Sequence, residues 1–267
     1  MTAGPAWAGG RFGERARCVL APNANMMTLD GTNTWVLREP GARQCVVVDP
    51  GPAVASHLDV VASAAGGAAV VLLTHGHADH SEAARTFAER MRCGVRALDP
   101  THRLGSEGLV DGEVVSVDGL EIRVVGTPGH TSDSLSFLLP AERAVLTGDT
   151  VLGRGTTVVA HPDGELGAYL GSLYRLRALA QTQEATRIWP GHGPVIDNAL
   201  ETLDYYVTHR QERLEQVREA LREREATAPS RDLARAIVEK VYADVDPVLW
   251  GAAELSVRAQ LAYLTSR

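Results

Sequence analysis

Cysteine is scarce in this 267-residue sequence, and long apolar runs are missing from it. The three cysteines, Cys18, Cys45 and Cys93, are odd in number and form no Cys-x-x-Cys pair. Their spacing argues against a disulfide framework and against a thiolate zinc site. No apolar run approaches the ~20 residues that cross a bilayer, so the sequence predicts a protein without membrane contact.

A secretion signal and an excess of positive charge are also missing. The N-terminus has no basic segment followed by an apolar one, so no signal peptide is predicted and a cytoplasmic protein is expected. The net charge of −7 lacks the basic balance of a protein that coats nucleic acid. With 45% hydrophobic and 22% charged residues, the composition is typical of a soluble globular protein.

Seven short apolar runs have the length and composition of buried β-strands. These expected strands are Thr34–Leu37, Cys45–Val48, Val70–Leu73, Ile122–Val125, Leu135–Leu139, Ala144–Leu146 and Arg187–Trp189. Helices are expected at Ser81–Arg92, with Ser81 as the N-cap, and at Tyr169–Gln181. Strands that alternate with helices predict an α/β or α+β domain with layered sheets.

Beyond about Asp197 the pattern becomes helical. Apolar residues recur every three or four positions along one long amphipathic segment. Two further helices are expected at Ser230–Tyr242, with Ser230 as a cap, and at Leu255–Leu264. The sequence therefore predicts a catalytic domain over residues 1–197 and a small helical appendage over residues 198–267.

The residues that carry chemistry follow the ends of four expected strands. The clearest group is His-x-His-x-Asp-His, formed by His75, His77, Asp79 and His80. Neutral imidazole and carboxylate are both zinc ligands, and this short loop can present two residues to each of two metals. Six residues cannot complete two coordination shells. The remaining candidates, at the other three strand ends, are His130, Asp149 and His192.

These motifs resemble the metallo-β-lactamase superfamily over roughly Asn23–Asp197. The resemblance implies a four-layer αββα sandwich and a two-metal centre, with zinc expected and iron or manganese as alternatives. Residue by residue, it implies that His75, His77 and His130 bind the first metal, that Asp79, His80 and His192 bind the second, and that Asp149 bridges them. Asp79 and Asp149 are the candidate catalytic residues. The implied reaction is hydrolysis by a hydroxide that bridges the metals.

Within the superfamily, the sequence is most similar to the lactamase-β-like endoribonucleases. Gly31–Trp35, Gly153–Thr157, Ile188–Ile196 and His209-Arg210 carry this similarity, together with a tail like a winged helix whose wing strands are not in the sequence. The implied substrate is a phosphodiester in single-stranded RNA. Without the wing, we expect the tail to pack on the catalytic domain or on a partner chain, and a homodimer is one such arrangement.

Other chemistries on this fold remain open. Glyoxalase-II-like enzymes and thioesterases that release acyl groups from carrier proteins share much of the pattern, which makes a small thioester or ester the alternative substrate. Asp149 stands where β-lactamases usually carry cysteine or serine, which disfavours that activity. An iron-dependent sulfur dioxygenase is a further alternative.

Three features outside the seven residues have two interpretations each. Asn33 either faces the site or satisfies a turn. The glycine-rich segment Gly153–Thr157 is either an anion-binding turn or a plain loop. The other histidines are expected to be surface or core residues, and they are His57, His102, His161 and His209.

Overall fold

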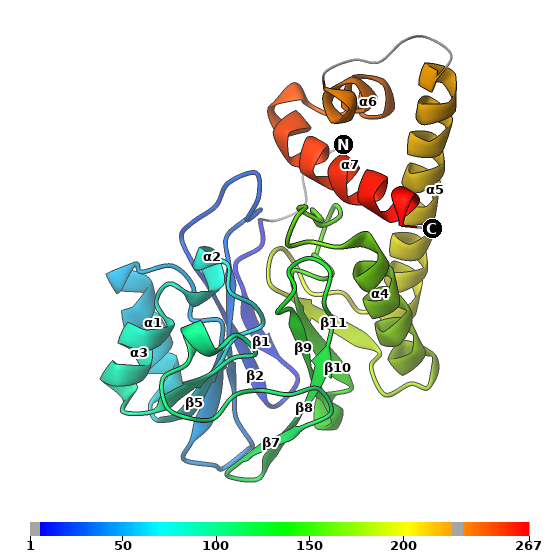
Figure 1. The fold of residues 1–267 in the computed structure, drawn as a ribbon. Helices are drawn as coiled ribbons and strands as arrows, with labels where there is room; N and C mark the ends of the chain where they lie inside the picture. The colour runs from blue at the N-terminus through cyan, green and yellow to red at the C-terminus, as the bar shows by residue number, and fades with distance from the viewer. Residues whose placement is uncertain (1–5, 226–231, 267) are drawn as a thin grey trace.

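The computed structural model describes residues 6–225 and 232–266. Two β-sheets face each other, and each is covered on its outer side by helices, while the last helices pack together at one end (Figure 1). This arrangement confirms the predicted four-layer α/β sandwich with a helical appendage. The predicted boundary at residues 197 and 198 falls just before the longest helix.

The first sheet has six strands in sequence order, antiparallel from β1 to β4 and parallel from β4 to β6. The strands are β1 (Gly10–Phe12), β2 (Ala16–Leu20), β3 (Asn33–Leu37), β4 (Cys45–Val48), β5 (Ala68–Leu72) and β6 (Gly94–Arg96). Strands β3 and β4 are buried throughout, as expected for strands with both faces covered.

Two helices, α1 (Ala55–Ala65) and α3 (Ala84–Met91), cover the outer face of this sheet (Figure 1). The predicted helix Ser81–Arg92 is wrong at its start, because a separate short helix, α2 (Ala78–Ser81), precedes α3. Ser81 does not cap α3; its hydroxyl donates to the carbonyl of Gly76 and closes the loop before α2. The chain thus bends where the metal-ligand motif requires a loop.

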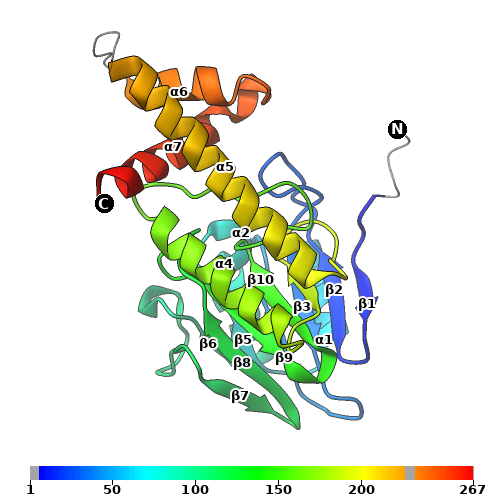
Figure 2. The ribbon, with the colours of Figure 1, turned by 90° about the vertical axis from the view of Figure 1, so that its right-hand side faces the viewer.

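The second sheet has five strands in the order β11-β10-β9-β8-β7. They are β7 (Val114–Val117), β8 (Leu120–Gly126), β9 (Leu135–Leu139), β10 (Ala144–Gly148) and β11 (Arg187–Pro190). Helices α4 (Leu166–Gln181) and α5 (Ala199–Glu225) run along its outer face (Figure 2). The described residues also form 3-10 turns at Pro100–His102, Pro140–Glu142 and Pro247–Leu249.

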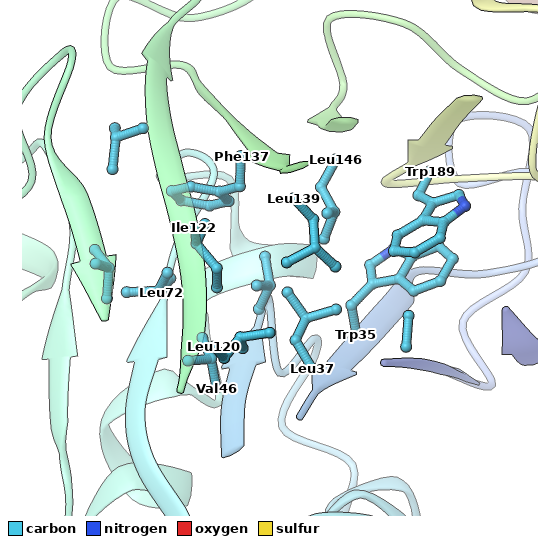
Figure 3. Close-up of a cluster of buried hydrophobic side chains, with 14 of the residues drawn as sticks. Trp35, Leu37, Val46, Leu72, Leu120, Ile122, Phe137, Leu139, Leu146 and Trp189 are labelled. Carbon is cyan, nitrogen blue, oxygen red and sulfur yellow. The ribbon is translucent and has the colours of Figure 1, made fainter. Parts of the chain in front are cut away.

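The main core lies between the two sheets (Figure 3). Trp35 of β3 stacks on Trp189 of β11 with ring centroids 5.2 Å apart and planes 13° from parallel. Both indoles are almost fully buried, so the pair fixes the distance between the sheets at the end that carries β11. The three cysteines are all free, as the sequence predicts.

The C-terminal end of α5 packs against α6 (Leu233–Val241) and α7 (Trp250–Thr265) around a small apolar cluster of their own. Asp232 caps α6 by accepting from the amide of Arg235, whereas the predicted cap Ser230 lies outside the described residues. Along the described parts of the chain, every helix is too short or too polar to cross a membrane.

Candidate metal centre

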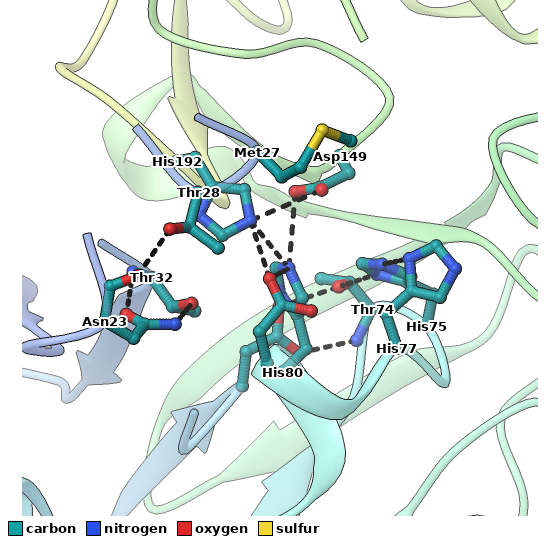
Figure 4. Close-up of polar contacts among 12 residues, drawn as sticks. Asn23, Met27, Thr28, Thr32, Thr74, His75, His77, His80, Asp149 and His192 are labelled. Carbon is teal, nitrogen blue, oxygen red and sulfur yellow. Dashed lines mark hydrogen bonds and ion pairs between the residues drawn. The ribbon is translucent and has the colours of Figure 1, made fainter. Parts of the chain in front are cut away.

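Seven side chains predicted from the sequence lie together at one end of the sandwich, and most of them are labelled in Figure 4. His75 follows β5 of the first sheet, while His130, Asp149 and His192 follow β8, β10 and β11 of the second sheet. The other three, His77, Asp79 and His80, come from the loop and short helix after His75. Both sheets therefore contribute side chains to one cluster.

Three histidines form the first set. Nδ1 of His77 lies 3.1 Å from Nε2 of His75 and 3.1 Å from Nε2 of His130. His75 and His130 are buried, whereas His77 is exposed. The three nitrogens thus converge on one point that opens to solvent past His77.

Two histidines and a carboxylate form the second set. Nε2 of His192 lies 3.2 Å from Nε2 of His80 and 3.1 Å from Oδ2 of Asp79. The side chain of Asp79 is 29% exposed, while those of both histidines are almost fully buried. Asp79 is therefore the member of this set that solvent can reach.

Asp149 stands between the two sets. Its Oδ1 lies 3.4 Å from Nε2 of His80, and its Oδ2 lies 3.4 Å from Nε2 of His192 and 3.8 Å from Nε2 of His130. Its Oδ1 is buried and has no hydrogen-bond partner among the described residues. A buried carboxylate oxygen without a partner is costly unless a cation or a bound water meets it.

Four of the five histidines are held from behind through the ring nitrogen that points away from the site. His80 Nδ1 donates to Oδ2 of Asp49 at 2.9 Å, and His192 Nδ1 donates to the carbonyl of Gly31 at 3.1 Å. His130 Nδ1 donates to the carbonyl of Val158 at 2.7 Å. These contacts orient each ring so that Nε2 faces the centre.

The fourth contact involves a chain of three groups. Thr74 Oγ1 donates its single proton to Oδ2 of Asp49 at 2.7 Å, so it can only accept from Nδ1 of His75, which lies 3.0 Å away. His75 Nε2 is then left with a lone pair that faces His77. Outer hydrogen bonds of this kind, to carboxylates and carbonyls, are typical of histidines that bind metals.

The electrostatics divide the site into a neutral part and a part that attracts positive charge. Burial lowers the pKa of His75 well below its ordinary value and also lowers that of His130. Both rings are therefore uncharged and have a lone pair available to bind a metal. Burial opposes charge on His192 too, but Asp149 and Asp79 outweigh it and raise its pKa to about 9. For His80, Asp149 and Asp49 likewise overcome burial and raise the pKa well above its usual range.

The carboxylates show the complementary effect. Burial alone would raise the pKa of Asp149, yet the neighbouring His192 and His80 hold that pKa well below its ordinary value. The pKa of Asp79 is lowered in the same way by His192 and His80 against the effect of burial. Both carboxylates are therefore ionised at neutral pH, and a bound cation would take the place of the protons on the histidines. The donor set fits a dinuclear centre.

The structure corrects the interpretation of Asn33. The side chain is buried, and its Nδ2 donates to the carbonyls of Pro190 and Gly193 at 2.9 and 2.8 Å. Its Oδ1 accepts from Nε1 of Trp7 at 2.8 Å. Asn33 therefore neither faces the site nor satisfies a turn; it ties β3 to the loop that carries His192.

Among the other histidines, His57 is a buried core residue whose Nε2 lies 2.9 Å from Oγ1 of Thr34, and it belongs to neither set. His209 stacks on Tyr205 of α5 with ring centroids 5.8 Å apart. In the glycine-rich segment, Arg154 pairs with Asp30 at 2.5 Å, so its charge is already neutralised. None of these groups adds a ligand within the described chain.

Asp49 is a site residue that the sequence interpretation missed. It accepts hydrogen bonds from the amide and the hydroxyl of Thr74 and from His80, and it is 1% exposed. A signal was present, because Asp49 directly follows the apolar run Cys45–Val48 just as Asp149 follows β10. Asp49 is far from the histidine motif along the chain, so the motif did not point to it.

A comparison with protein families matches residues 27–192 to the metallo-β-lactamase superfamily and residues 234–267 to a β-lactamase-associated winged-helix domain. An atrochrysone carboxyl ACP thioesterase from Aspergillus fumigatus is 37% identical, over 85% of this chain and 74% of its own. A β-lactamase-like protein 2 homolog from Caenorhabditis elegans is 34% identical, over 85% and 76% of the two chains.

A metallo-β-lactamase family protein from Thermus thermophilus has the same fold, with a TM-score of 0.74 at 21% identity over 94% of this chain and 93% of its own. These matches do not single out the endoribonuclease subgroup, which stays a prediction. The family match covers more than half of the chain and contains the first and last of the seven residues. The chain therefore belongs to the metallo-β-lactamase superfamily and has its hydrolase fold.

Proposed function

We propose that this protein is a dinuclear zinc hydrolase that cleaves acyl thioesters. The first ion would be held by His75, His77 and His130, the second by Asp79, His80 and His192, with Asp149 between them. The observation that carries the proposal is the inward orientation of the ring nitrogens, fixed from behind by hydrogen bonds. Imidazole with carboxylate is a preferred donor set for zinc, although iron and manganese accept similar ligands.

When bound, two zinc ions would supply a nucleophile from water near neutral pH and would polarise the substrate oxygen. The chain itself provides orientation and access. His80 and His192 are rigid because each is buried and hydrogen-bonded on its outer side. Substrate would approach past His77 and Asp79, the two most exposed groups of the cluster.

The segments that contact His192 favour an apolar substrate over a polyanion. The segment 23–31 ends at Gly31, whose carbonyl contacts His192, and it exposes Met26 and Met27 by 50% and 51%. The amide of Gly153 donates to the carbonyl of His192. The next residue, Arg154, is already paired with Asp30. An acyl chain is compatible with such a surface, whereas RNA would require free cations.

The protonation states point to the same substrate class. Asp79 and Asp149 both have pKa values below their ordinary range, because the histidines beside them outweigh burial, so neither is a proton donor at neutral pH. A thiol has a pKa of about 8.5 and can depart as thiolate without a donor. The name of the 37% identical relative, a thioesterase for acyl carrier protein, also supports the proposal.

Hydrolysis of a panel of thioesters tests the proposal. The panel would include acyl N-acetylcysteamine conjugates and S-lactoylglutathione, with single-stranded RNA and a β-lactam as comparisons. We expect thioester turnover that Asp149→Asn lowers at least about 100-fold in kcat/KM, because the group between the metals is lost. Asp111→Asn, which alters an exposed aspartate paired with Arg175, should leave turnover unchanged. Background rates on every thioester would overturn this assignment.

Elemental analysis of the purified protein tests the metal. Two zinc ions per chain are expected. One iron per chain would instead favour an oxidative reaction such as a sulfur dioxygenase, because a single redox metal serves oxygen chemistry.

A second candidate, cleavage of single-stranded RNA, is favoured by the match of residues 234–267 to a winged-helix domain. Winged and related helix-turn-helix modules often contact nucleic acid. Metal-dependent cleavage of RNA, absent in Asp149→Asn and accompanied by inactivity on thioesters, would establish this candidate instead.

A further inference from the structure

Arg210 of α5 is a buried cation whose role is not explained by the seven ligands. It is only 5% exposed, its guanidinium lies 5.0 Å from the ring centroid of Tyr169, and its Nη2 donates to the carbonyl of Thr157. Its Nε has no hydrogen-bond partner among the described residues. Burial of a charged group costs free energy, so the contact with Thr157 should have a role that explains why the charge is kept.

The segment that Arg210 contacts is the one that holds His130. Thr157 precedes Val158, whose carbonyl accepts the hydrogen bond from Nδ1 of His130 at 2.7 Å. Thr157 Oγ1 also lies 3.3 Å from that nitrogen. A shift of this short stretch would move the acceptor that fixes the ring of His130 and its tautomer.

Neighbouring side chains hold the start of the same loop. Tyr206, one helical turn before Arg210, accepts from the amide of Leu152 at 2.9 Å and contacts the carbonyl of Gly155 at 3.1 Å. Tyr169 of α4 donates to the carbonyl of Thr150 at 2.7 Å. Side chains of α4 and α5 thus attach the loop between Asp149 and the carbonyl that contacts His130 to the helices outside the sheet.

We infer that Arg210 is a positioning residue for the first metal: through Thr157 it fixes the Val158 carbonyl that orients His130. This inference rests on the proposed metal centre. Arginine suits the task because it stays charged and its planar group both donates and stacks on Tyr169, which a lysine ammonium reproduces only in part.

Arg213, three residues further along α5, provides a matched control. Its Nη1 donates to the carbonyl of Val241 at 2.6 Å, and its guanidinium lies 4.7 Å from the ring centroid of Tyr242. Arg213 also donates to Oε1 of Gln216 at 3.1 Å and lies 3.8 Å from Asp244. Its contacts join α5 to the end of α6 and not to the metal loop, so loss of Arg213 removes a stacked guanidinium and a bond to a carbonyl, as loss of Arg210 does, without touching that loop.

Zinc binding to the metal-free protein, measured by competition with a chromophoric chelator, tests the inference. The wild type should give two dissociation constants. Arg210→Met should weaken one site about tenfold and leave the other unchanged, and Arg210→Lys should recover part of the loss. Arg213→Met should leave both constants unchanged. Thermal unfolding of the metal-free variants checks that each one folds.

A double-mutant cycle assigns the weakened site. In a His130→Ala background, Arg210→Met should have no further effect on zinc affinity, since it acts through that ring. Unchanged constants in Arg210→Met, an equal loss at both sites, or an equal loss in Arg213→Met would overturn the inference. A wild type that binds no zinc would instead overturn the proposed metal centre, so the two failures are distinguishable.

Discussion

At the scale of single residues, the outer hydrogen bonds decide which ring nitrogens face the site. Asp49 is the clearest case, since it accepts hydrogen bonds from His80 and from the Thr74 hydroxyl, and that hydroxyl in turn accepts from Nδ1 of His75. It therefore links a histidine of the first set to one of the second. Its carboxylate can only accept, which forces both partners to donate.

Replacement of Asp49 should consequently weaken metal binding without removing a ligand. Asp49→Asn introduces an amide donor among groups that already donate, so we expect zinc affinity to fall about 10–100-fold. Zinc retained after dialysis measures the effect. Asp118→Asn is the control, because Asp118 accepts from two backbone amides of an exposed loop and lies outside the site. Equal zinc retention in the two variants would contradict the role given to Asp49.

His57 should make stability depend on pH. Burial lowers the pKa of His57, against a smaller opposing effect of a hydrogen bond with the Pro50 backbone. A histidine with a lowered folded pKa favours the folded state above its unfolded pKa of about 6.5, and this contribution is lost as the pH falls through that value towards the folded pKa. The loss should thus occur below about pH 6.5.

His57→Gln should therefore reduce the loss of stability between pH 7 and pH 5, as measured by urea unfolding at each pH. His161→Gln, at an exposed position, serves as the comparison. An unchanged pH dependence in His57→Gln would show that other groups control the acid response.

At the scale of elements, the turns after the strands determine how closely the ligands approach. Gly191, directly before His192, has no room for a side chain: an added Cβ would lie 2.6 Å from Oδ1 of Asp149 and 2.8 Å from Cε1 of His80. The ends of β10 and β11 can meet at the site only because this position is glycine.

Gly191→Ala should accordingly displace Asp149 or His80 and reduce zinc binding. The matched change Gly171→Ala falls within α4, where an added Cβ meets nothing within 4 Å, and it should stabilise the helix by up to about 1 kcal/mol. Zinc titration and thermal unfolding of the two variants separate these effects. Full zinc affinity in Gly191→Ala would refute the close-packing argument.

The elements that the sequence predicted are those with strong local patterns. The runs Cys45–Val48 and Leu135–Leu139 are strands with those same bounds. The strands β1 and β6 have only three residues each, and β7 exposes alternate positions, so their apolar signal is weak. Helix α1 was missed as well, and its first turn has no side-chain cap to mark it.

At the scale of the whole molecule, the two sheets should be joined more firmly when metal is present. Ligands from β5 on one sheet and from β8, β10 and β11 on the other would share the ions, so metal binding opposes separation of the sheets. A ligand that binds only the folded state stabilises it by mass action.

Zinc should therefore raise the unfolding temperature of the chelator-treated protein. At 100 times the dissociation constant, one site contributes about 2.7 kcal/mol. For a chain of this size that corresponds to about 5–10 °C. Differential scanning calorimetry measures the shift, which should shrink in Asp149→Asn. An equal shift in wild type and variant would place the bound zinc elsewhere.

Assembly and location are decided at this same scale, and both stay predictions. A homodimer is tested by light scattering on the purified protein. The cytoplasmic location is tested by fractionation.

The sequence by itself determined the seven candidate ligands and most of the buried strands. Three local patterns can be recognised in the sequence without knowledge of the fold. They are the strand periodicity, the His-x-His-x-Asp-His motif and the change to helical spacing near Asp197. The superfamily followed from the same residues, and the family match confirms it.

Only the tertiary structure decided what surrounds those ligands. Asp49 meets His80 across 31 positions, Asn33 meets Gly193 across 160, and Arg210 meets Thr157 across 53. These contacts depend on how two sheets and their outer helices pack, which no local pattern encodes. The packing of distant segments fixes the ring orientations, and with them the chemistry that the site can perform.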